Sequence, residues 1–348
     1  MTAAPQSPSG SRYRRSPYLV IAWEGPELVL VNGDTLRRFR VDHALVTLLS
    51  ALQDWLDRDS LADSGHPVPA DELERLARFG ILEVSVPGET PIPQDPTYWD
   101  PFDLAVHRQS NVGGYRPTEL AARGDPPPLT FKQRPPGPCT GLPLPDDLPI
   151  PLGTALAQRR SVRSYDPRAL TLHELSTVLH HSARIVSVMQ DTVVGELALR
   201  PFPGGGARSE LELYVLANHV DGLPAGAHYY DAREHDLIEV RRKDDYQSRI
   251  NRWIHGSTGG QLNRDPAVVL LVTAVFSRVM WKYRGIALGL IYKDVGCLFQ
   301  TLYLAATAQG LAPCAIGGGE ERHNAQWLGL DPLVESQVGC FLLGPAVE

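Results

Sequence analysis

Cysteine and long apolar runs are both scarce in this sequence. The four cysteines are widely spaced and form no Cys-x-x-Cys pair, so neither a zinc site nor a dense disulfide framework is indicated. The longest strongly apolar run, residues 267–276, is about half of the ~20 residues that a membrane-spanning helix needs. Residues 1–17 contain no apolar core of the kind that a secretory signal requires. We therefore expect a cytoplasmic protein with reduced thiols, without a metal ion or a membrane span.

Positive charge is also in short supply. The chain has 33 lysines and arginines against 40 aspartates and glutamates, which gives a formal net charge of −7. Broad binding to nucleic acid depends on positive charge that displaces counterions, so this balance argues against it. Hydrophobic residues make up 43% of the chain and charged residues 21%, as in folded globular proteins. At 348 residues the chain has room for one large domain or two ordinary ones.

The N-terminal part of the chain predicts a small module over residues 18–86, preceded by a disordered segment, residues 1–17. Strands are predicted over residues 18–23, 28–31, 36–41 and 81–84, with one helix capped by Asp42 and another over 70–79 that Gly80 ends. This order indicates a winged-helix-like, peptide-recognition-like module. Its clustered arginines are Arg12, Arg14, Arg15, Arg37, Arg38 and Arg40. They fit either an acidic leader peptide or a solvated face, and we favour the solvated face.

Residues 87–150 predict a connector rather than a domain. Proline is dense there, with runs at 126–128 and 135–136, and regular structure would repeatedly lose backbone donors. A freely flexible tether is more usually rich in Gly and Ser. We therefore expect an extended segment that lies along the second domain.

From residue 151 to residue 348 the pattern becomes α/β. Thr171 and Glu174 have the spacing of a capping box and predict the start of a helix. Residues 210–215 alternate polar with apolar, as in a strand covered on one face, whereas the continuous apolar run 267–276 predicts a central strand. Further elements are predicted over residues 152–158 (helix), 294–309 (long helix ended by Gly310) and 340–343 (strand).

Three arginines within five positions open this second domain, in the run Arg159-Arg160-Ser161-Val162-Arg163. Guanidinium groups bind phosphate in a bidentate manner, and the Ser161 hydroxyl can add a further bond. The same arginines also fit a solvated helix end, where the helix dipole favours positive charge. Composition alone favours the helix end.

Two further segments have the composition of ligand-binding loops. Consecutive glycines within residues 200–208 would let the backbone approach a flat or phosphorylated ligand, although an ordinary flexible loop fits equally well. Lys282 beside Tyr283 pairs a tunable amine with a phenol, which would suit acid–base chemistry in a buried position. Most such pairs lie at a protein surface, so this pattern is weak by itself.

The order and spacing of these segments resemble the nitroreductase superfamily, and within it the SagB-type dehydrogenases, which are flavin oxidases of azole-forming peptide pathways. The resemblance spans residues 151–344 and extends more weakly through the N-terminal module. It is carried by the arginine motif, the glycine loop, a hairpin motif at 222–231, Lys282-Tyr283-Arg284 at the usual distance before Asp294-Val295-Gly296, and a loop at 310–318. The combination in this order is more specific than any single match.

The resemblance implies an α+β fold of the nitroreductase type, with a mixed, mostly antiparallel sheet wrapped by helices in an interlocked homodimer that holds FMN at its interface. The implied reaction oxidises a thiazoline or oxazoline ring of a peptide to the azole, with O₂ reoxidising the flavin, and the pathway suggests a cyclodehydratase as a partner. Lys282 and Tyr283 are the implied proton-transfer residues. The implied cofactor contacts are Arg159, Arg160, Ser161, Arg163, Pro203, Gly204, Gly205, Arg208, Ile316, Gly317 and Gly318.

Four positions depart from the family pattern and leave two alternatives open. Gly204 stands where the family loop usually has Ser, Ile286 and Gly289 where relatives commonly have arginines, and Cys297 where many have His. These departures bear on the substrate and on turnover more than on flavin binding. One alternative is an NAD(P)H-dependent nitro- or quinone reductase on the same fold. The other is a non-catalytic FMN-binding scaffold for a peptide-modifying complex.

Overall fold

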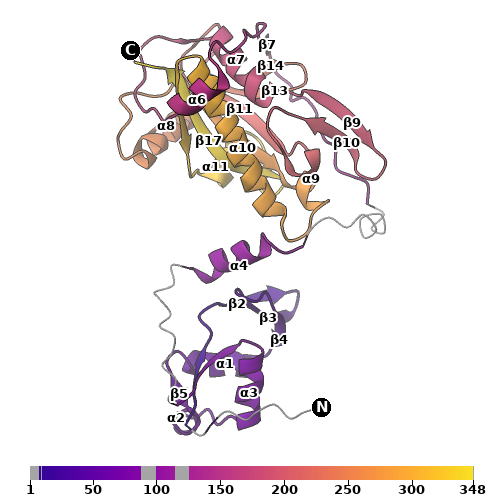
Figure 1. Cartoon of the computed structure of the whole chain (residues 1–348), viewed down its shortest axis with the longest axis vertical. Helices are drawn as coiled ribbons and strands as arrows, with labels where there is room; N and C mark the ends of the chain where they lie inside the picture. The colour runs from indigo at the N-terminus through magenta and orange to yellow at the C-terminus, as the bar shows by residue number, and fades with distance from the viewer. Residues whose placement is uncertain (1–7, 9, 88–98, 114–124, 348) are drawn as a thin grey trace. The chain divides into compact units, whose positions relative to one another are not determined.

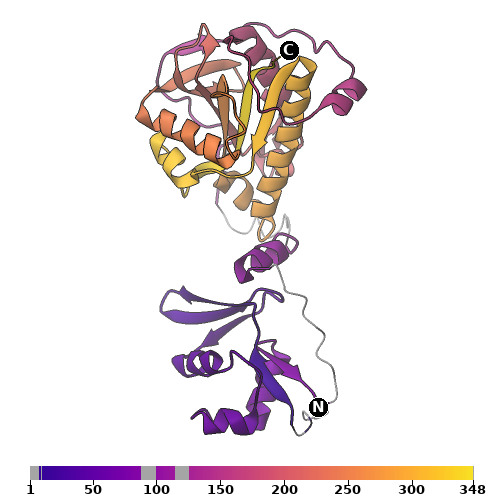
Figure 2. The same ribbon diagram turned by 90° about the vertical axis from the view of Figure 1, so that its left-hand side faces the viewer.

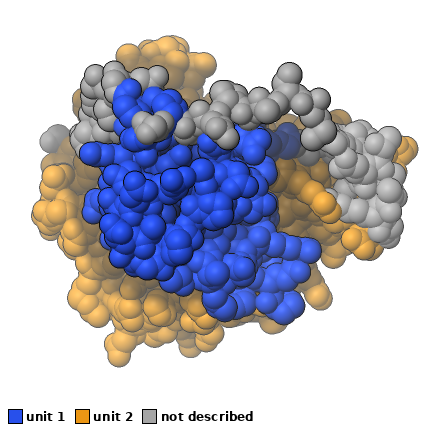
Figure 3. All heavy atoms as spheres, turned by 90° about the horizontal axis from the view of Figure 1, so that it is seen from below, with its two compact units in different colours: residues 1–113 blue, residues 114–348 orange. Residues whose placement is uncertain are grey.

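The structure is a computed structural model of the 348-residue chain and describes residues 8, 10–87, 99–113 and 125–347. The chain folds as two compact units, Met1–Gly113 and Gly114–Glu348, which Figure 3 colours separately. We call them unit 1 and unit 2. No helix among the described residues is both long enough and apolar enough to cross a membrane.

Unit 1 contains two three-stranded antiparallel sheets packed with short helices (Figure 1). One sheet has the order β5 (Leu56–Asp57), β1 (Arg12–Arg15) and β6 (Leu82–Ser85), and the other is the meander β2 (Leu19–Glu24), β3 (Glu27–Asn32) and β4 (Arg38–Val41). The helices are α1 (His43–Ala51), α2 (Arg58–Asp63), α3 (Ala70–Arg78) and α4 (Pro101–Gln109). The Asp42 carboxylate accepts a hydrogen bond from the Leu45 N–H at 2.9 Å, which confirms the predicted cap. The order α1, β5, α2, α3, β6 is compatible with a winged-helix-like module, which stays a prediction.

Two features of unit 1 correct the expectations from sequence. Disorder was expected over residues 1–17, of which 1–7 and 9 lie outside the described residues, but β1 forms because Tyr13 is buried in the core of unit 1. Residues 101–109, within the expected connector, form helix α4. Its Asp100 caps the Phe102 N–H at 2.8 Å, and Pro101 stands at the first helical position, which tolerates proline.

Unit 2 is built on a seven-stranded sheet in which every pair of neighbours is antiparallel. Its order is β16 (Leu311–Ile316), β17 (Glu335–Pro345), β15 (Val268–Val275), β11 (Leu211–Ala217), β13 (Gly226–Asp231), β14 (Asp236–Arg242) and β7 (Cys139–Gly141). The predicted sheet type is therefore confirmed, and the apolar run 267–276 forms an interior strand of it. A separate hairpin joins β9 (Ser187–Asp191) and β10 (Gly195–Leu199).

Helices cover both faces of this sheet (Figures 1 and 2). Helices α7 (Leu172–Ala183) and α10 (Ala287–Ala308) pack on one face, and α8 (Asp245–Ser257) and α11 (Glu321–Trp327) on the other. Successive strand residues point to opposite faces, so Leu270 joins the core under α10 while Leu271 joins the core under α8. The predicted capping box is present at Thr171 and Glu174, where α7 begins.

Strand β11 differs from its prediction as a strand covered on one face. All its residues are buried, including Glu212. The polar side chain is tolerated because its carboxylate accepts hydrogen bonds from Arg278 at 2.7 Å and from the Tyr229 hydroxyl at 3.0 Å. A buried ion pair therefore produced the polar-apolar alternation that suggested exposure.

From residue 125 onward, the proline-rich segment lies along unit 2. Lys132 donates to Glu335 at 2.7 Å and to the Tyr214 hydroxyl at 2.6 Å, on the sheet. Arg134 pairs with two aspartates at 2.7 Å each, and β7 adds to the sheet edge. The segment ends at the short helix α6 (Leu152–Gln158).

Candidate active site

Two of the predicted cofactor residues that follow α6, Arg159 and Ser161, contact Tyr303 of α10. The Ser161 hydroxyl lies 2.6 Å from the Tyr303 hydroxyl, which also accepts the Ala315 N–H of β16 at 2.7 Å. The Arg159 guanidinium lies over the Tyr303 ring, 5.2 Å from its centre. Sequence analysis missed Tyr303, because a tyrosine within the apolar stripe of a helix is usually a core residue.

Arg163 supplies the observation that tests whether this group fits an anion. Its Nε is buried and has no hydrogen-bond partner among the described residues. Leaving a charged donor unsatisfied is costly, and a phosphate would remove that cost. Arg160 beside it is exposed, as is Ser161. These residues therefore fit the phosphate of FMN.

The predicted loop after β16 borders the same strand. Ile316 is buried, and Gly317 and Gly318 are exposed. The two glycines line a pocket of about 210 Å³, which Tyr292 and Gly339 also line. The Val162 N–H donates to the carbonyl of Pro313 in β16 at 2.8 Å. The arginine segment and the glycine pocket are thus attached to one strand, β16. We use the name phosphate-side group for Arg159, Arg160, Ser161, Arg163, Ile316, Gly317 and Gly318.

The remaining predicted residues form a second group around Gly206, which we call the loop group. Gly206 has φ +65°, and a Cβ there would lie 2.5 Å from the Tyr283 hydroxyl and 2.6 Å from Lys282 Nζ. Only glycine fits such a position. Lys282 and Tyr283 therefore pack directly on the glycine loop, and both are half-buried. Burial, reinforced by the nearby Arg208 charge, lowers the pKa of Lys282 and favours its neutral amine.

A buried pair of carboxyl groups lies behind the same loop. Asp294 Oδ2 accepts a hydrogen bond from the Gly205 N–H at 2.6 Å. Burial, together with a hydrogen bond to Asp294, raises the pKa of Glu210 to about 8. Sequence analysis did not assign Glu210 to the site, because it treated this residue as part of a half-exposed strand. The available signal was Asp294, an acidic residue on the buried side of α10 that needs polar partners nearby.

Arg208, predicted as a cofactor contact, lies inside unit 2. It is fully buried, and its guanidinium donates to the carbonyls of Pro128, Val194, Glu196 and Arg278 at 2.6, 2.7, 2.9 and 3.4 Å. These four hydrogen bonds hold the glycine loop in place, and the role of Arg208 as a cofactor contact stays a prediction. Pro203 and Gly204, in contrast, are exposed.

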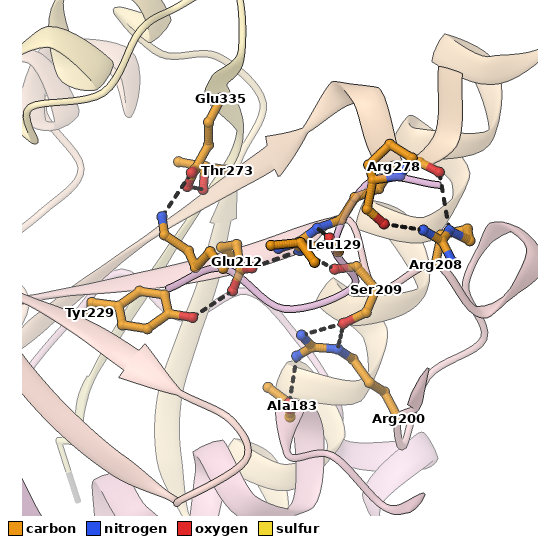
Figure 4. A network of polar contacts seen from close by, with 12 residues as sticks. Leu129, Ala183, Arg200, Arg208, Ser209, Glu212, Tyr229, Thr273, Arg278 and Glu335 are labelled. Carbon is orange, nitrogen blue, oxygen red and sulfur yellow. Dashed lines mark hydrogen bonds and ion pairs between the residues drawn. The ribbon is translucent and has the colours of Figure 1, made fainter. Parts of the chain in front are cut away.

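Figure 4 shows the polar network around Arg208 and the base of the loop. Arg200 donates to the Ser209 hydroxyl and, at 2.7 Å, to the Ala183 carbonyl. Arg278 donates to the Ser209 carbonyl at 2.6 Å and to the Leu129 carbonyl at 2.9 Å. The loop group is therefore rigidly supported, as catalytic side chains need to be.

The two groups lie on different sides of α10. Asp294 and Tyr303 are nine residues apart in this helix. At about 1.5 Å and about 100° per residue, they are separated by roughly 13 Å along the axis and half a turn around it. The described residues of one chain therefore do not bring Lys282 and Tyr283 together with Arg159, Ser161 and Arg163.

Comparison with known proteins shows which family has a similar sequence. Residues 156–344 match the model of the nitroreductase family. A nitroreductase-type protein of Methanocaldococcus jannaschii is 28% identical over 175 residues, which cover 50% of this chain and 82% of that protein. The trifolitoxin-processing protein TfxB of Rhizobium leguminosarum bv. trifolii is 26% identical over 183 residues, covering 51% of this chain and 48% of TfxB. A solved structure of a protein from Ralstonia eutropha is 22% identical in sequence. The superposition covers 64% of this chain and 98% of that protein's chain, with a TM-score of 0.48.

Proposed function

Because the chain belongs to the nitroreductase family, we propose that it is an FMN-dependent oxidoreductase that oxidises a thiazoline or oxazoline ring of a peptide to the aromatic azole. The observation that carries the proposal is the packing of Lys282 and Tyr283 on Gly206, beside exposed loop positions where a flat ligand can approach. Ring oxidation removes one proton and one hydride, so it needs a base next to the hydride acceptor.

The phosphate-side group fits the cofactor. Arg159, Ser161 and Arg163 would hold the FMN phosphate, since the buried Arg163 Nε requires an acceptor. Gly317 and Gly318 would lie along the ring system, where the absence of side chains allows close approach. Bound FMN would accept the hydride and pass the electron pair to O₂, giving hydrogen peroxide.

Lys282 would accept the proton. Its pKa is lowered by burial, so the neutral amine is present at a lower pH than for an exposed lysine. Tyr283 would orient the amine or relay the proton from it. The overall change balances as azoline plus O₂ giving azole plus hydrogen peroxide, with the proton leaving Lys282 after each turnover.

We propose a homodimer, because the two groups lie on different sides of α10 in one chain. A second copy would bring its loop group, with Pro203, Gly204 and Gly205, to the phosphate-side group of the first. The hairpin β9–β10 supports this proposal, since Val188 and Met189 on it are 41% and 46% exposed. These two side chains point to opposite faces of the hairpin, and a partner chain would bury the one on its side.

A peptide substrate is supported by the similarity to TfxB, which processes trifolitoxin. Unit 1 would then recognise part of the peptide, and a cyclodehydratase would supply the azoline. The arginines of unit 1 give limited support to peptide recognition by this unit. Arg38 pairs with Glu24, and Arg40 pairs with Glu27, at the surface. Such pairs fit the solvated face that composition favours.

The test is a purified protein with a peptide that contains one azoline ring. We expect about one FMN per subunit and a peptide product lighter by two hydrogens in mass spectrometry. Absence of flavin after reconstitution with FMN would refute the proposal.

The similarity to a nitroreductase-type protein favours a second candidate, an NAD(P)H-dependent nitro- or quinone reductase. Rapid NADPH consumption with a nitroarene, and none of the peptide product, would establish that candidate instead.

A further inference from the structure

We propose that Gln337 is a further cofactor-binding residue, whose side-chain amide donates a hydrogen bond to an acceptor atom at the ring edge of FMN. Asn324 is the positioning residue that holds this amide in place. The inference rests on the FMN of the proposed function and not on the azoline reaction. Its location is the pocket of about 210 Å³ that Gly317 and Gly318 line.

A β-bulge in β17 decides which way Gln337 points. In the ladder with β15, Val272 pairs with Gly339 and Thr273 pairs with Gln337, so Val338 is an extra residue between the two pairs. Gly339 lies against side chains of α10, and Val338 packs against the core on the same face. Regular alternation would therefore place Gln337 on this apolar face too. The bulge instead turns its side chain to the face that α11 covers.

A chain of hydrogen bonds orients the Gln337 amide. The Tyr246 hydroxyl donates to Asn324 Oδ1 at 3.0 Å, and Asn324 Nδ2 donates to Gln337 Oε1 at 2.6 Å. Asn324 and Gln337 are only 3% and 7% exposed, so water competes little for these bonds. Because the oxygen of the Gln337 amide is engaged, its Nε2 is the donor that remains for a ligand.

This donor lies at the pocket. Among the residues that the structure describes, Gln337 Nε2 has no hydrogen-bond acceptor, and the side chain lines the pocket. The amide also lies directly against Gly319, where a Cβ would clash with it. The other polar side chains that line the pocket, those of Tyr292 and Glu321, are exposed. Gln337 is therefore the polar lining group whose position is fixed before a ligand arrives.

The chemistry of the pocket suits the edge of a flat ring. Gly317, Gly318 and Gly319 have no side chains that would keep a ring away from the backbone. The isoalloxazine ring of FMN has carbonyl oxygens and unprotonated ring nitrogens at its edge, and these atoms accept hydrogen bonds. A preset amide donor adds one directional bond to them, whose loss should weaken binding about threefold to tenfold.

Titration of the flavin-free, full-length protein with FMN and with riboflavin tests the contact, because riboflavin has the same ring but no phosphate. Gln337→Leu should weaken the binding of both flavins by the same factor, about threefold to tenfold. Arg163→Ala should weaken the binding of FMN and leave that of riboflavin unchanged. The comparison thus separates a ring contact from a phosphate contact.

Asn324→Asp tests the positioning role with little change in volume. Its carboxylate can only accept, so Gln337 has to turn Nε2 toward it and present Oε1 to the pocket. We expect the affinity for both flavins to fall at least as much as in Gln337→Leu. The visible absorption bands of bound flavin respond to hydrogen bonds at the ring, so they should shift in both variants and keep their wild-type positions in Arg163→Ala.

The matched control is Gln326→Leu, which makes the same chemical change at an exposed position of α11. It should change neither the two affinities nor the absorption bands. Wild-type riboflavin affinity and wild-type bands in both Gln337→Leu and Asn324→Asp would overturn the inference while the proposed function stands. A wild-type protein that binds neither flavin would refute both, whereas one that binds flavin in the expected pattern but leaves azoline peptides unchanged would refute the proposed function alone.

Discussion

The buried ion pair between Arg278 and Glu212 should be worth several kcal/mol to the stability of unit 2. Its side chains are only 2% and 5% exposed, and the guanidinium lies 2.7 Å from the carboxylate. Among the described residues, Arg278→Met would leave Glu212 with the Tyr229 hydroxyl as its donor, and it would remove the donors to the Leu129 and Ser209 carbonyls. Removing one partner of such a pair costs about 3–5 kcal/mol. We therefore expect the free energy of unfolding of unit 2 to fall by that amount.

The measurement is native-state hydrogen exchange of the β11 and β15 segments, which reports the unfolding of unit 2 alone. Arg249→Met is the matched control, because Arg249 also lies 2.7 Å from a carboxylate, that of Glu320, but is 48% exposed. That exposed pair should contribute no more than about 1 kcal/mol. Adding Glu212→Gln to Arg278→Met should recover about 1–3 kcal/mol by removing the uncompensated charge. A cost below about 1 kcal/mol for Arg278→Met, equal to that of the control, would refute the argument.

Three further predictions concern the proposed cofactor and its chemistry. Arg159→Ala or Arg163→Ala should weaken FMN binding about tenfold to a hundredfold, through loss of a charge-assisted bond, and retention of full affinity in both variants would show that they only end a helix. Tyr303→Phe leaves the Ala315 N–H without its acceptor and should lower the free energy of unfolding by about 1–3 kcal/mol, measured by urea denaturation. Lys282→Ala and Tyr283→Phe should keep bound flavin but lose azole formation at least about 100-fold in the mass-spectrometric assay, whereas wild-type rates would exclude both as catalysts.

Local patterns in the sequence were sufficient for much of the fold. The capping box at Thr171 and Glu174 and the Asp42 cap depend only on residues three positions apart, and both are present. The apolar run of β15 identifies an interior strand because both its faces are buried. These signals need no knowledge of distant partners.

The errors arose where a distant residue decides the outcome. Glu212 alternates with apolar residues as a surface residue would. Arg278, 66 positions later, and the Tyr229 hydroxyl make its burial tolerable. The sequence motif that contains Arg208 did not predict its acceptors either, which include the Pro128 carbonyl, 80 positions earlier. Glu210 is adjacent to the predicted loop, yet its raised pKa depends on burial and on Asp294 of helix α10. Spacing along the chain carries none of this information.

The attachment of the connector has a practical consequence for dissecting the protein. The carbonyls of Pro128 and Leu129 are acceptors for the buried side chains of Arg208 and Arg278. A truncated protein that begins at residue 151, where the family resemblance begins, would lack both acceptors and would leave two guanidinium groups inside the fold without them. The smallest fragment able to hold its own glycine loop therefore has to include the proline-rich segment from about residue 125.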